Sequence, residues 1–176
     1  MQPHGLFHAH ALKDVRPMTM PAATTLLAWN RLLRAAELAE QHCSATLQSL
    51  GLPPPAWYDV LLTLERSGAQ RPRDLQGVLG LEQYALSRLL DRMVKAGLLE
   101  RTPCTDDARG HTLNLTIEGL AMRAAMWPVF AAAIEEALGA RVAEEDRVTL
   151  ARLLAPLAEP IRPERCAPSV ARPAPR

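Results

Sequence analysis

Residues 80–119 read GLEQYALSRLLDRMVKAGLLERTPCTDDARGHTLNLTIEG, and this stretch decides the fold that we expect. Its first half places apolar residues at the spacing of one helix face, and these are Tyr84, Leu86, Leu89, Leu90, Met93 and Val94. The opposite face is polar, with a basic lean. Gly97 follows, and Gly often ends a helix because it adopts the left-handed conformation without strain. The pattern therefore predicts an amphipathic helix that ends near Gly97.

A β-hairpin is expected directly after this helix. Residues 98–102 and 111–115 form two short segments, which are joined by a polar loop with turn residues. Ahead of the helix, Pro72 begins a short expected helix over residues 72–79, and Gly80 separates the two. This order is the layout of a winged helix-turn-helix, in which the second helix reads DNA and the hairpin is the wing. The predicted fold class is therefore mainly α with a small β-hairpin wing.

The second half of the stretch contains an ordered motif at fixed spacing, Asp107-x-Arg109-Gly110-x4-Leu115-Thr116-x2-Gly119. This motif resembles the wing of the multiple antibiotic resistance regulator (MarR) family, and so does the sequence of residues 86–101. The resemblance is strongest over residues 56–119. It implies a winged helix-turn-helix between dimerisation helices, in a transcription regulator that binds double-stranded DNA.

Composition sets wider limits. The chain has 176 residues, which fits one domain with a dimerisation element, and its few aromatic residues suit a mostly helical protein. A net charge of +1 does not itself indicate a nucleic-acid binder, so any basic surface must be local. We expect no apolar run long enough to span a membrane and no secretory signal. Three unclustered cysteines, Cys43, Cys104 and Cys166, indicate reduced thiols in a cytoplasmic protein.

One folded domain is expected over residues 22–159, between a flexible N-terminal extension (1–21) and a disordered, proline-rich tail (160–176). Within it, the winged helix-turn-helix covers residues 55–116, and dimerisation helices cover residues 22–50 and 120–159. Both flanking regions carry more apolar surface than a small winged domain needs, which indicates burial against a partner subunit. The family resemblance implies the same homodimer.

Capping residues and prolines indicate where the helices begin and end. Thr24 or Thr25 is expected to cap the first helix, which ends near Ser49. Three consecutive prolines then precede a helix over residues 56–66, whose inward-facing residues are Val60, Leu61 and Leu64. Thr116 is expected to cap a long helix after the wing.

Two further features are expected in the C-terminal region. Pro128 is expected to kink that long helix or to restart it after Trp127. A last helix is expected over about residues 144–157.

The predicted DNA contacts come mostly from the reading helix. Arg88 or Gln83 is expected to engage guanine or adenine edges, whereas Ser87 and Arg92 hold phosphates. Tyr84 has two interpretations, as a DNA contact or as part of the small core. The full predicted set is Arg71, Arg73, Gln83, Tyr84, Ser87, Arg88, Arg92 and Arg109. The plainer alternative for these charges is a solvated helix face.

The wing and the helix start carry further predictions. Arg109 is expected to enter the minor groove, where negative potential is concentrated. Asp107, paired with an Arg of the hairpin or of the reading helix, and Gly110 are expected to shape the wing. Glu82 departs from the family pattern, because Ser, Thr or Asp would cap the reading helix better and would not repel phosphates.

A small-molecule pocket is implied by the family, which often binds aromatic or phenolic acids between the dimerisation helices and the reading unit. The candidate lining residues are Trp29, Arg34, His42, Trp57 and Tyr58. A redox switch is the alternative, in which nearby positive charge activates Cys104. Cys104 as a surface residue without a role is the plainer interpretation, and Cys43 is expected to be a buried, small apolar residue.

Catalysis and metal binding have little support in the sequence. The known phosphate-loop, nucleophile-elbow and zinc patterns do not occur, and neighbouring His42 and Cys43 point about 100° apart on a helix. His4 and His8 would share a face of a helix, but an unstructured extension is the favoured interpretation. We therefore expect a protein that is not an enzyme and has no cofactor and no metal.

Two functions of different classes remain open at this point. The first is a homodimeric, ligand-responsive transcription regulator, a repressor that leaves a pseudo-palindromic operator when a small aromatic acid binds. The second is a winged-helix protein-interaction module without DNA binding, which Glu82 and the near-neutral charge favour. A Cys-based redox-sensing regulator is a variant of the first. Salt-dependent duplex binding separates the two classes.

Overall fold

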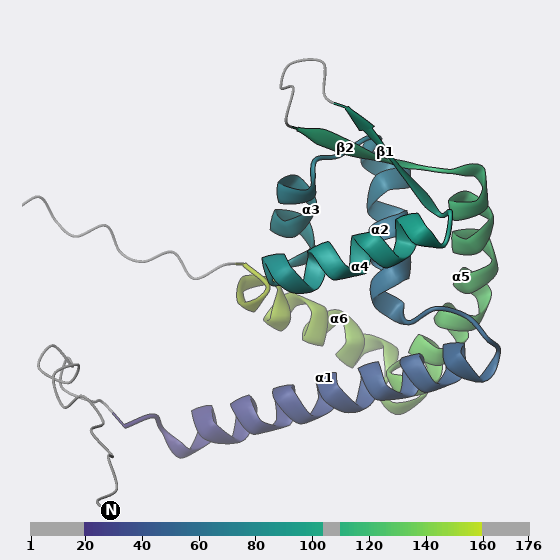
Figure 1. Cartoon of the computed structure of the whole chain (residues 1–176). Coiled ribbons are helices and arrows are strands. Elements are labelled where there is room, and N and C mark those ends of the chain that lie inside the picture. The colour runs from purple at the N-terminus through teal and green to yellow at the C-terminus, as the bar shows by residue number, and fades with distance from the viewer. Residues whose placement is uncertain (1–19, 104–109, 160–176) are drawn as a thin grey trace, which may run out of the picture.

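The computed structural model describes residues 20–103 and 110–159. The described part is mainly helical with one two-stranded antiparallel sheet, which confirms the predicted fold class (Figure 1). In chain order its elements are α1 (Ala23–Ser49), α2 (Pro55–Ser67), α3 (Pro72–Leu79), α4 (Gln83–Lys95), β1 (Leu99–Pro103), β2 (His111–Leu115), α5 (Ile117–Ala137), η1 (Gly139–Arg141), α6 (Glu144–Leu154) and η2 (Ala155–Leu157).

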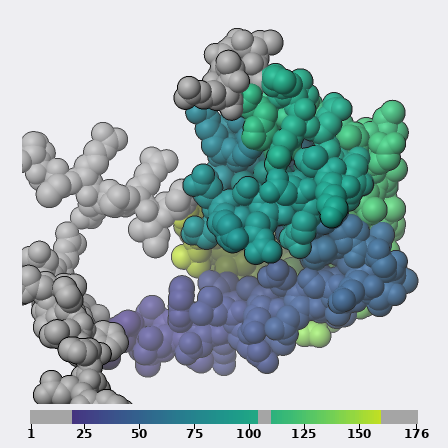
Figure 2. Space-filling model, in the orientation of Figure 1, coloured from purple at the N-terminus to yellow at the C-terminus, as the bar shows by residue number. Residues whose placement is uncertain are grey.

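The molecule has two parts that α5 connects. Helices α2, α3 and α4 pack with the hairpin into one body, and α1 and α6 lie on the side away from the hairpin (Figure 1). Helix α5 descends from the base of the hairpin, packs on α2 and reaches α1. In the space-filling view, α1 forms a long bar along the lower edge of the molecule, below the surface that α4 presents (Figure 2). The winged unit is therefore a compact body on a long helical support.

The core lies inside the winged unit. Its buried residues come from α2, α3, α4, the hairpin, the end of α1 and the middle of α5, and they are Leu47, Tyr58, Val60, Leu61, Leu64, Leu75, Leu86, Leu89, Leu90, Met93, Leu98, Leu99, Leu113 and Met126. The three residues of α2 that were predicted to face inward are all among them. Tyr84 is not, because 73% of its surface is exposed, so its interpretation as a core residue is wrong.

A network of short contacts joins the hairpin to α5. Thr116 caps α5 as predicted, since its Oγ1 accepts a hydrogen bond from the Gly119 N–H at 3.0 Å. The same Oγ1 donates to the Gly97 carbonyl at 2.8 Å, and the Thr116 N–H donates to the Leu98 carbonyl at 3.2 Å. A Cβ on Gly119 would lie 2.3 Å from that Leu98 oxygen. Only Gly lets the two backbones approach so closely.

The hairpin is also bonded to the turn before α3. Leu99 pairs with Leu115 and Pro103 with His111, so β1 begins one residue later than expected. Gln70 adds an isolated bridge to Leu113, with N···O distances of 3.2 and 2.8 Å between the two backbones. Gly97 has a φ of 75°, as expected for the residue that ends α4 in the left-handed conformation. The hairpin base is therefore hydrogen-bonded to the segments on both sides of it.

Three sequence predictions about the helices are corrected. Helix α1 begins at Ala23 with Ala22 as its N-cap, so Thr24 and Thr25 lie in its first turn and do not cap it. The earlier start follows because the Ala22 carbonyl accepts the Leu26 N–H and the small alanines tolerate helical backbone. Pro128 lies inside an unbroken α5, so the helix does not restart after Trp127. The last helix ends at Leu154, and η2 follows it.

Pro128 is accommodated because α5 is held on both sides of it. Met126 and Ala133 are both fully buried, and α5 packs against α2 before reaching α1. This tertiary packing offsets the loss of the hydrogen bond that the missing proline N–H would make.

The expectation that no apolar run could span a membrane is also wrong by length and composition. Residues 117–141 meet that criterion, the one such helix in the described part of the chain. Arg123 and Pro128 lie within this stretch, and it remains apolar enough to meet the criterion. Only 17% of the apolar window is buried within the chain. Because Arg123 forms a 2.6 Å ion pair with Glu65 of α2, this helix is tied to the winged unit, and its remaining apolar surface needs a cover.

The predicted N-terminal extension and C-terminal tail fall almost entirely outside the described residues. Residues 1–19 and 160–176 lie outside the described residues, and so do His4, His8 and Cys166.

Candidate nucleic-acid interface

A groove of about 380 Å³ lies between α3, α4 and the hairpin. Its lining residues are Arg71, Pro72, Arg73, Gln76, Gln83, Leu86, Ser87, Leu90, Arg101, Gly110 and His111. Four of the predicted DNA contacts, Arg71, Arg73, Gln83 and Ser87, therefore meet in one place. Among the described residues, no Asp or Glu belongs to this lining, so this part of the groove combines cations and hydrogen-bond donors.

Local turn geometry places these side chains. Pro72 opens α3 at its first helical position, which leaves Arg71 as the N-cap at the edge of the groove. Gly80 ends α3 with a left-handed φ of 63°, and this conformation lets the chain turn directly into α4. Leu86, Leu89, Leu90 and Met93 then bury one side of α4, so Gln83 and Ser87 face the groove.

The positive charge of the groove is partly balanced by carboxylates just outside it. Arg73 lies 3.6 Å from Asp74, measured from Nε to Oδ1. Arg101 of β1 donates a short hydrogen bond to Asp91 of α4. Among residues 20–103 and 110–159, Arg71 forms no ion pair. It is the groove cation with the least internal competition for an anionic ligand.

The other predicted contacts on α4 lie outside the groove, on the exposed face of the helix. Tyr84 and Arg88 are one helical turn apart, and the guanidinium carbon of Arg88 lies 5.6 Å from the centre of the Tyr84 ring. Arg92 is exposed in the last turn. Glu82 is the N-cap of α4 and makes no side-chain capping hydrogen bond, as its poor capping chemistry predicted.

Sequence reasoning missed two residues of this surface, Arg101 and His111. Arg101 lies in β1 opposite Leu113, and His111 begins β2 opposite Pro103 at the loop end of the hairpin; both line the groove. The clue was available, because β1 starts two residues after Gly97 and must run back beside α4. The contact between Arg101 and Asp91 joins the hairpin to the reading helix, a role that was predicted for Asp107. Asp107, Arg109 and Cys104 lie outside the described residues, and Gly110 lines the groove.

The five candidate residues of the effector pocket do not converge within the chain. Tyr58 is buried in the core, where it stacks on Trp127 (5.7 Å between ring centroids) and meets the edge of Phe130 (5.2 Å). Trp57 packs beside the same core, and its buried Nε1 has no hydrogen-bond partner among the described residues. Trp29 lies elsewhere, in an apolar groove of about 1010 Å³ between α1, the end of α5 and α6.

Arg34 and His42 do meet, in a separate cleft of about 730 Å³. Arg31 and Arg141 join them there, and the rest of the lining is mainly Ala, Leu and Val from α1, α5 and α6. Arg34 also forms a 3.1 Å ion pair with Glu37. The cleft therefore has the composition of a site for an anion with an apolar body.

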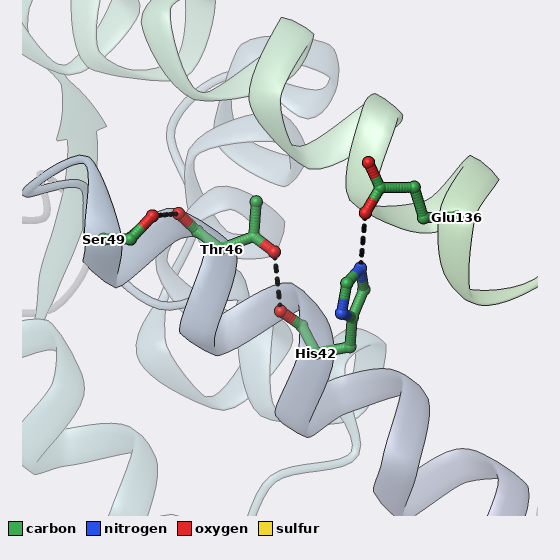
Figure 3. Close-up of polar contacts among 4 residues, drawn as sticks. All are labelled: His42, Thr46, Ser49 and Glu136. Atoms are coloured by element: carbon green, nitrogen blue, oxygen red, sulfur yellow. Dashed lines mark hydrogen bonds and ion pairs between the residues drawn. The ribbon is translucent and has the colours of Figure 1, made fainter.

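His42 also connects α1 to α5. Its Nε2 lies 3.0 Å from Oε2 of Glu136, and Figure 3 shows the two side chains pointing toward each other from the two helices. On the same helix, Thr46 Oγ1 donates to the His42 carbonyl at 2.9 Å, and Ser49 Oγ donates to the Thr46 carbonyl at 2.8 Å (Figure 3). The contact between His42 and Glu136 makes the wall of the cleft a junction between the two supporting helices.

Two groups near this junction have shifted pKa values. Burial raises the pKa of the Cys43 thiol, and only 5% of this residue is exposed, which confirms the predicted buried, small apolar role. A raised pKa lowers the thiolate fraction, so Cys43 is a poor nucleophile. Desolvation, followed by repulsion from Glu40, raises the pKa of the Asp59 carboxyl.

Asp59→Asn is expected to raise the free energy of unfolding at neutral pH, because it removes a charge that desolvation and Glu40 disfavour. The gain should be less than about 1 kcal/mol, because Asp59 is exposed and solvent screens its charge. The folded chain binds this proton more tightly than the unfolded chain. Stability is therefore lost as the pH rises from the ordinary Asp value of 3.8 through the folded pKa. Urea unfolding of both proteins at pH 7 and below 3.8 checks this. If Asp59→Asn is still more stable than wild type at the lower pH, the cause is not electrostatic. Glu40→Gln should give part of the same increase in the free energy of unfolding at pH 7.

The comparisons with known proteins agree with this geometry. Residues 50–110 match the model of the MarR family. The multiple antibiotic resistance protein MarR of Escherichia coli (strain K12) is 37% identical over 67 residues, which are 38% of this chain and 46% of that protein. The HTH-type transcriptional regulator PecS of Dickeya dadantii (strain 3937) is 37% identical over 68 residues, or 37% of this chain and 41% of that protein. The chain thus spans less than half the length of the curated relatives it matches.

Two solved structures from Streptomyces coelicolor are similar over most of the chain. The MarR family regulator AbsC has a TM-score of 0.70 at 28% identity, covering 80% of this chain and 96% of that one. Sco3205, a MarR family regulator solved in complex with DNA, has a TM-score of 0.75 at 27% identity, covering 84% and 93%.

Proposed function

Because the chain belongs to the MarR family of winged helix-turn-helix transcription regulators, we propose that it binds double-stranded DNA as a homodimeric repressor. The family members it resembles are regulators and not enzymes. The observation that carries the proposal is the groove between α3, α4 and the hairpin. It gathers Arg71, Arg73 and Arg101 with hydrogen-bonding side chains, and none of its lining residues within 20–103 and 110–159 is a carboxylate. Such a surface suits phosphates flanking a helix that enters the major groove.

The homodimer is proposed from the apolar surface that a single chain leaves exposed. These residues lie on α1, α5 and α6 and include Leu26, Leu27, Trp29, Leu33, Leu38, Trp127, Ile134, Leu138, Val148 and Leu153. Exposed apolar side chains gathered on these three helices suit an interface, and a second copy would supply the same surface by symmetry. The expected operator is pseudo-palindromic, with half-sites about one helical turn apart. A regulator of this kind works in the cytoplasm.

Release by a small aromatic acid is proposed at the cleft that holds Arg34 and His42. Arg31 and Arg141 add charge for a carboxylate, and the aliphatic lining accepts an aromatic ring. The cleft lies where α1, α5 and α6 meet, so its occupant would alter the contacts between the supporting helices. Benzoate should lower the affinity of the protein for DNA, whereas uncharged benzyl alcohol should not.

Fluorescence anisotropy across a salt series tests DNA binding, with the upstream intergenic DNA of the protein's own gene as the duplex. We expect nanomolar affinity that falls steeply with salt, because each neutralised phosphate releases counterions. Arg71→Ala should weaken binding. It should also reduce the slope of log affinity against log salt concentration by about one for each subunit. Arg152→Ala, a matched loss of charge on α6, should change neither quantity.

Weak binding that is equal for the three proteins would contradict the proposal. The winged-helix protein-interaction module would then be the better interpretation.

A further inference from the structure

The exposed face of α4 carries one ordered pair of side chains, Tyr84 and Arg88. Tyr84 is 73% exposed and contributes nothing to the core, which α4 reaches through its leucines and Met93. The guanidinium carbon of Arg88 lies 5.6 Å from the centre of the Tyr84 ring. At this distance the cation is attracted by the face of the ring, and the i, i+4 spacing on the helix supports the contact.

Arg88 contacts Tyr84 and does not pair with Asp91, its nearest acidic neighbour in the sequence. Asp91 lies three residues after Arg88 on the same helix, a spacing at which an ion pair would be usual. Asp91 instead accepts a hydrogen bond from Arg101 of β1. Within residues 20–103 and 110–159, Arg88 accordingly has no carboxylate partner. Asp91 is thus paired with the hairpin, and the contact of Arg88 on this face is with Tyr84.

A cation–π contact is made without a hydrogen bond, so it leaves the N–H donors of the guanidinium available. The five donors of Arg lie in one plane, and two of them can donate parallel hydrogen bonds to one ligand. Guanine presents the matching acceptors, O6 and N7, in the major groove. Restricting the Arg rotamers before binding reduces the entropy lost when those bonds form.

We propose that Tyr84 and Arg88 are a preassembled reading pair, in which Tyr84 positions Arg88 to read one guanine in each half-site. The inference rests on the proposed DNA-binding function and adds the base that the helix discriminates. Arg88 makes the base contact, and Tyr84 is a positioning residue that acts through it. The groove cations, by contrast, hold the backbone and carry no sequence information.

The test measures discrimination at each base pair, with a duplex selected by the wild-type protein from a randomised library. Each base pair is replaced in turn, and the loss of affinity is recorded for wild type, Arg88→Lys, Tyr84→Phe and Tyr84→Leu. Wild type should lose roughly 5- to 150-fold at one G·C pair per half-site. Arg88→Lys should lose that discrimination while keeping the salt slope, because the charge stays but the planar fork is absent.

The Tyr84 variants separate positioning from simple contact. Tyr84→Phe keeps the aromatic face and should keep the discrimination, whereas Tyr84→Leu should reduce it by roughly two- to fivefold at the same base pair. Both changes lie on an exposed position, and thermal unfolding monitored by circular dichroism checks that the variants fold. Unchanged discrimination in Tyr84→Leu, or a loss at a different base pair from Arg88→Lys, overturns the inference and leaves DNA binding intact. Failure of the wild type to select any duplex overturns the proposed function together with the reading pair.

Discussion

Gly119→Ala should lower the free energy of unfolding by about 2–3 kcal/mol, because the added methyl group meets backbone that cannot yield. A Cβ at this position would lie 2.3 Å from the Leu98 carbonyl oxygen and 2.7 Å from Cδ1 of Leu115. The carbonyl is fixed, since it already accepts the Thr116 N–H at the start of α5. The helix propensity that Ala gains over Gly is worth only about 1 kcal/mol, so the clash dominates. The midpoint of thermal unfolding should fall by roughly 5–10 °C.

Gly77→Ala is the matched control. Gly77 lies inside α3, and a Cβ there would meet no atom within 4 Å. We expect this variant to be more stable than wild type by up to about 1 kcal/mol, which reflects helix propensity alone. Urea unfolding of the three proteins measures both effects. Equal stabilities for the two variants would show that the hairpin and α5 do not approach as closely as described.

Leu153→Glu should weaken self-association by at least about 100-fold, because an unpaired carboxylate buried between two subunits costs several kcal/mol. Leu153 lines the apolar groove between α1, α5 and α6, and 55% of it is exposed in a single chain. The chain should therefore still fold, and only the association should suffer. Sedimentation equilibrium measures the dimer constant. Affinity for the operator should fall in parallel, since a monomer engages only one half-site.

Val78→Glu makes the same change on an exposed apolar residue of the winged unit, where 70% of the side chain is exposed. It should leave self-association unchanged. A wild-type protein that stays monomeric at high concentration would contradict the dimer. Association of the wild type with lipid vesicles would instead assign the exposed face of α5 to a membrane surface.

The winged unit was predictable because local sequence signals mark the ends of its helices and strands. Pro72 and Gly80 bracket α3, and the strands start within one residue of their expected positions. The apolar spacing of α4 correctly gave its buried face, apart from Tyr84. These signals act over a few residues, so they do not depend on the rest of the fold.

The features that sequence reasoning missed depend on tertiary neighbours. Pro128 stays inside α5 because packing holds the helix on both sides of it, and no local rule reports that support. Tyr58 was assigned to a ligand pocket, but Trp127, some seventy residues later, stacks on it in the core. Arg101 belongs to the groove because β1 folds back beside α4. In each case a distant segment decides between two roles that the residue type allows equally.

The hydrogen bonds at the hairpin base have a consequence for how a signal could travel. Gln70 is bridged to Leu113, and Thr116 holds both Gly97 and Leu98, so hydrogen bonds join the two strands to the turn before α3, the end of α4 and the start of α5 as one block. Bending within that block would break several of these bonds at once. In the proposed dimer, an event at the supporting helices would therefore reach DNA as a change in the distance between two intact DNA-reading units. The dimer would then respond to a signal by changing the distance between its two DNA-reading units. The affinity for operators with altered half-site spacing would report that distance.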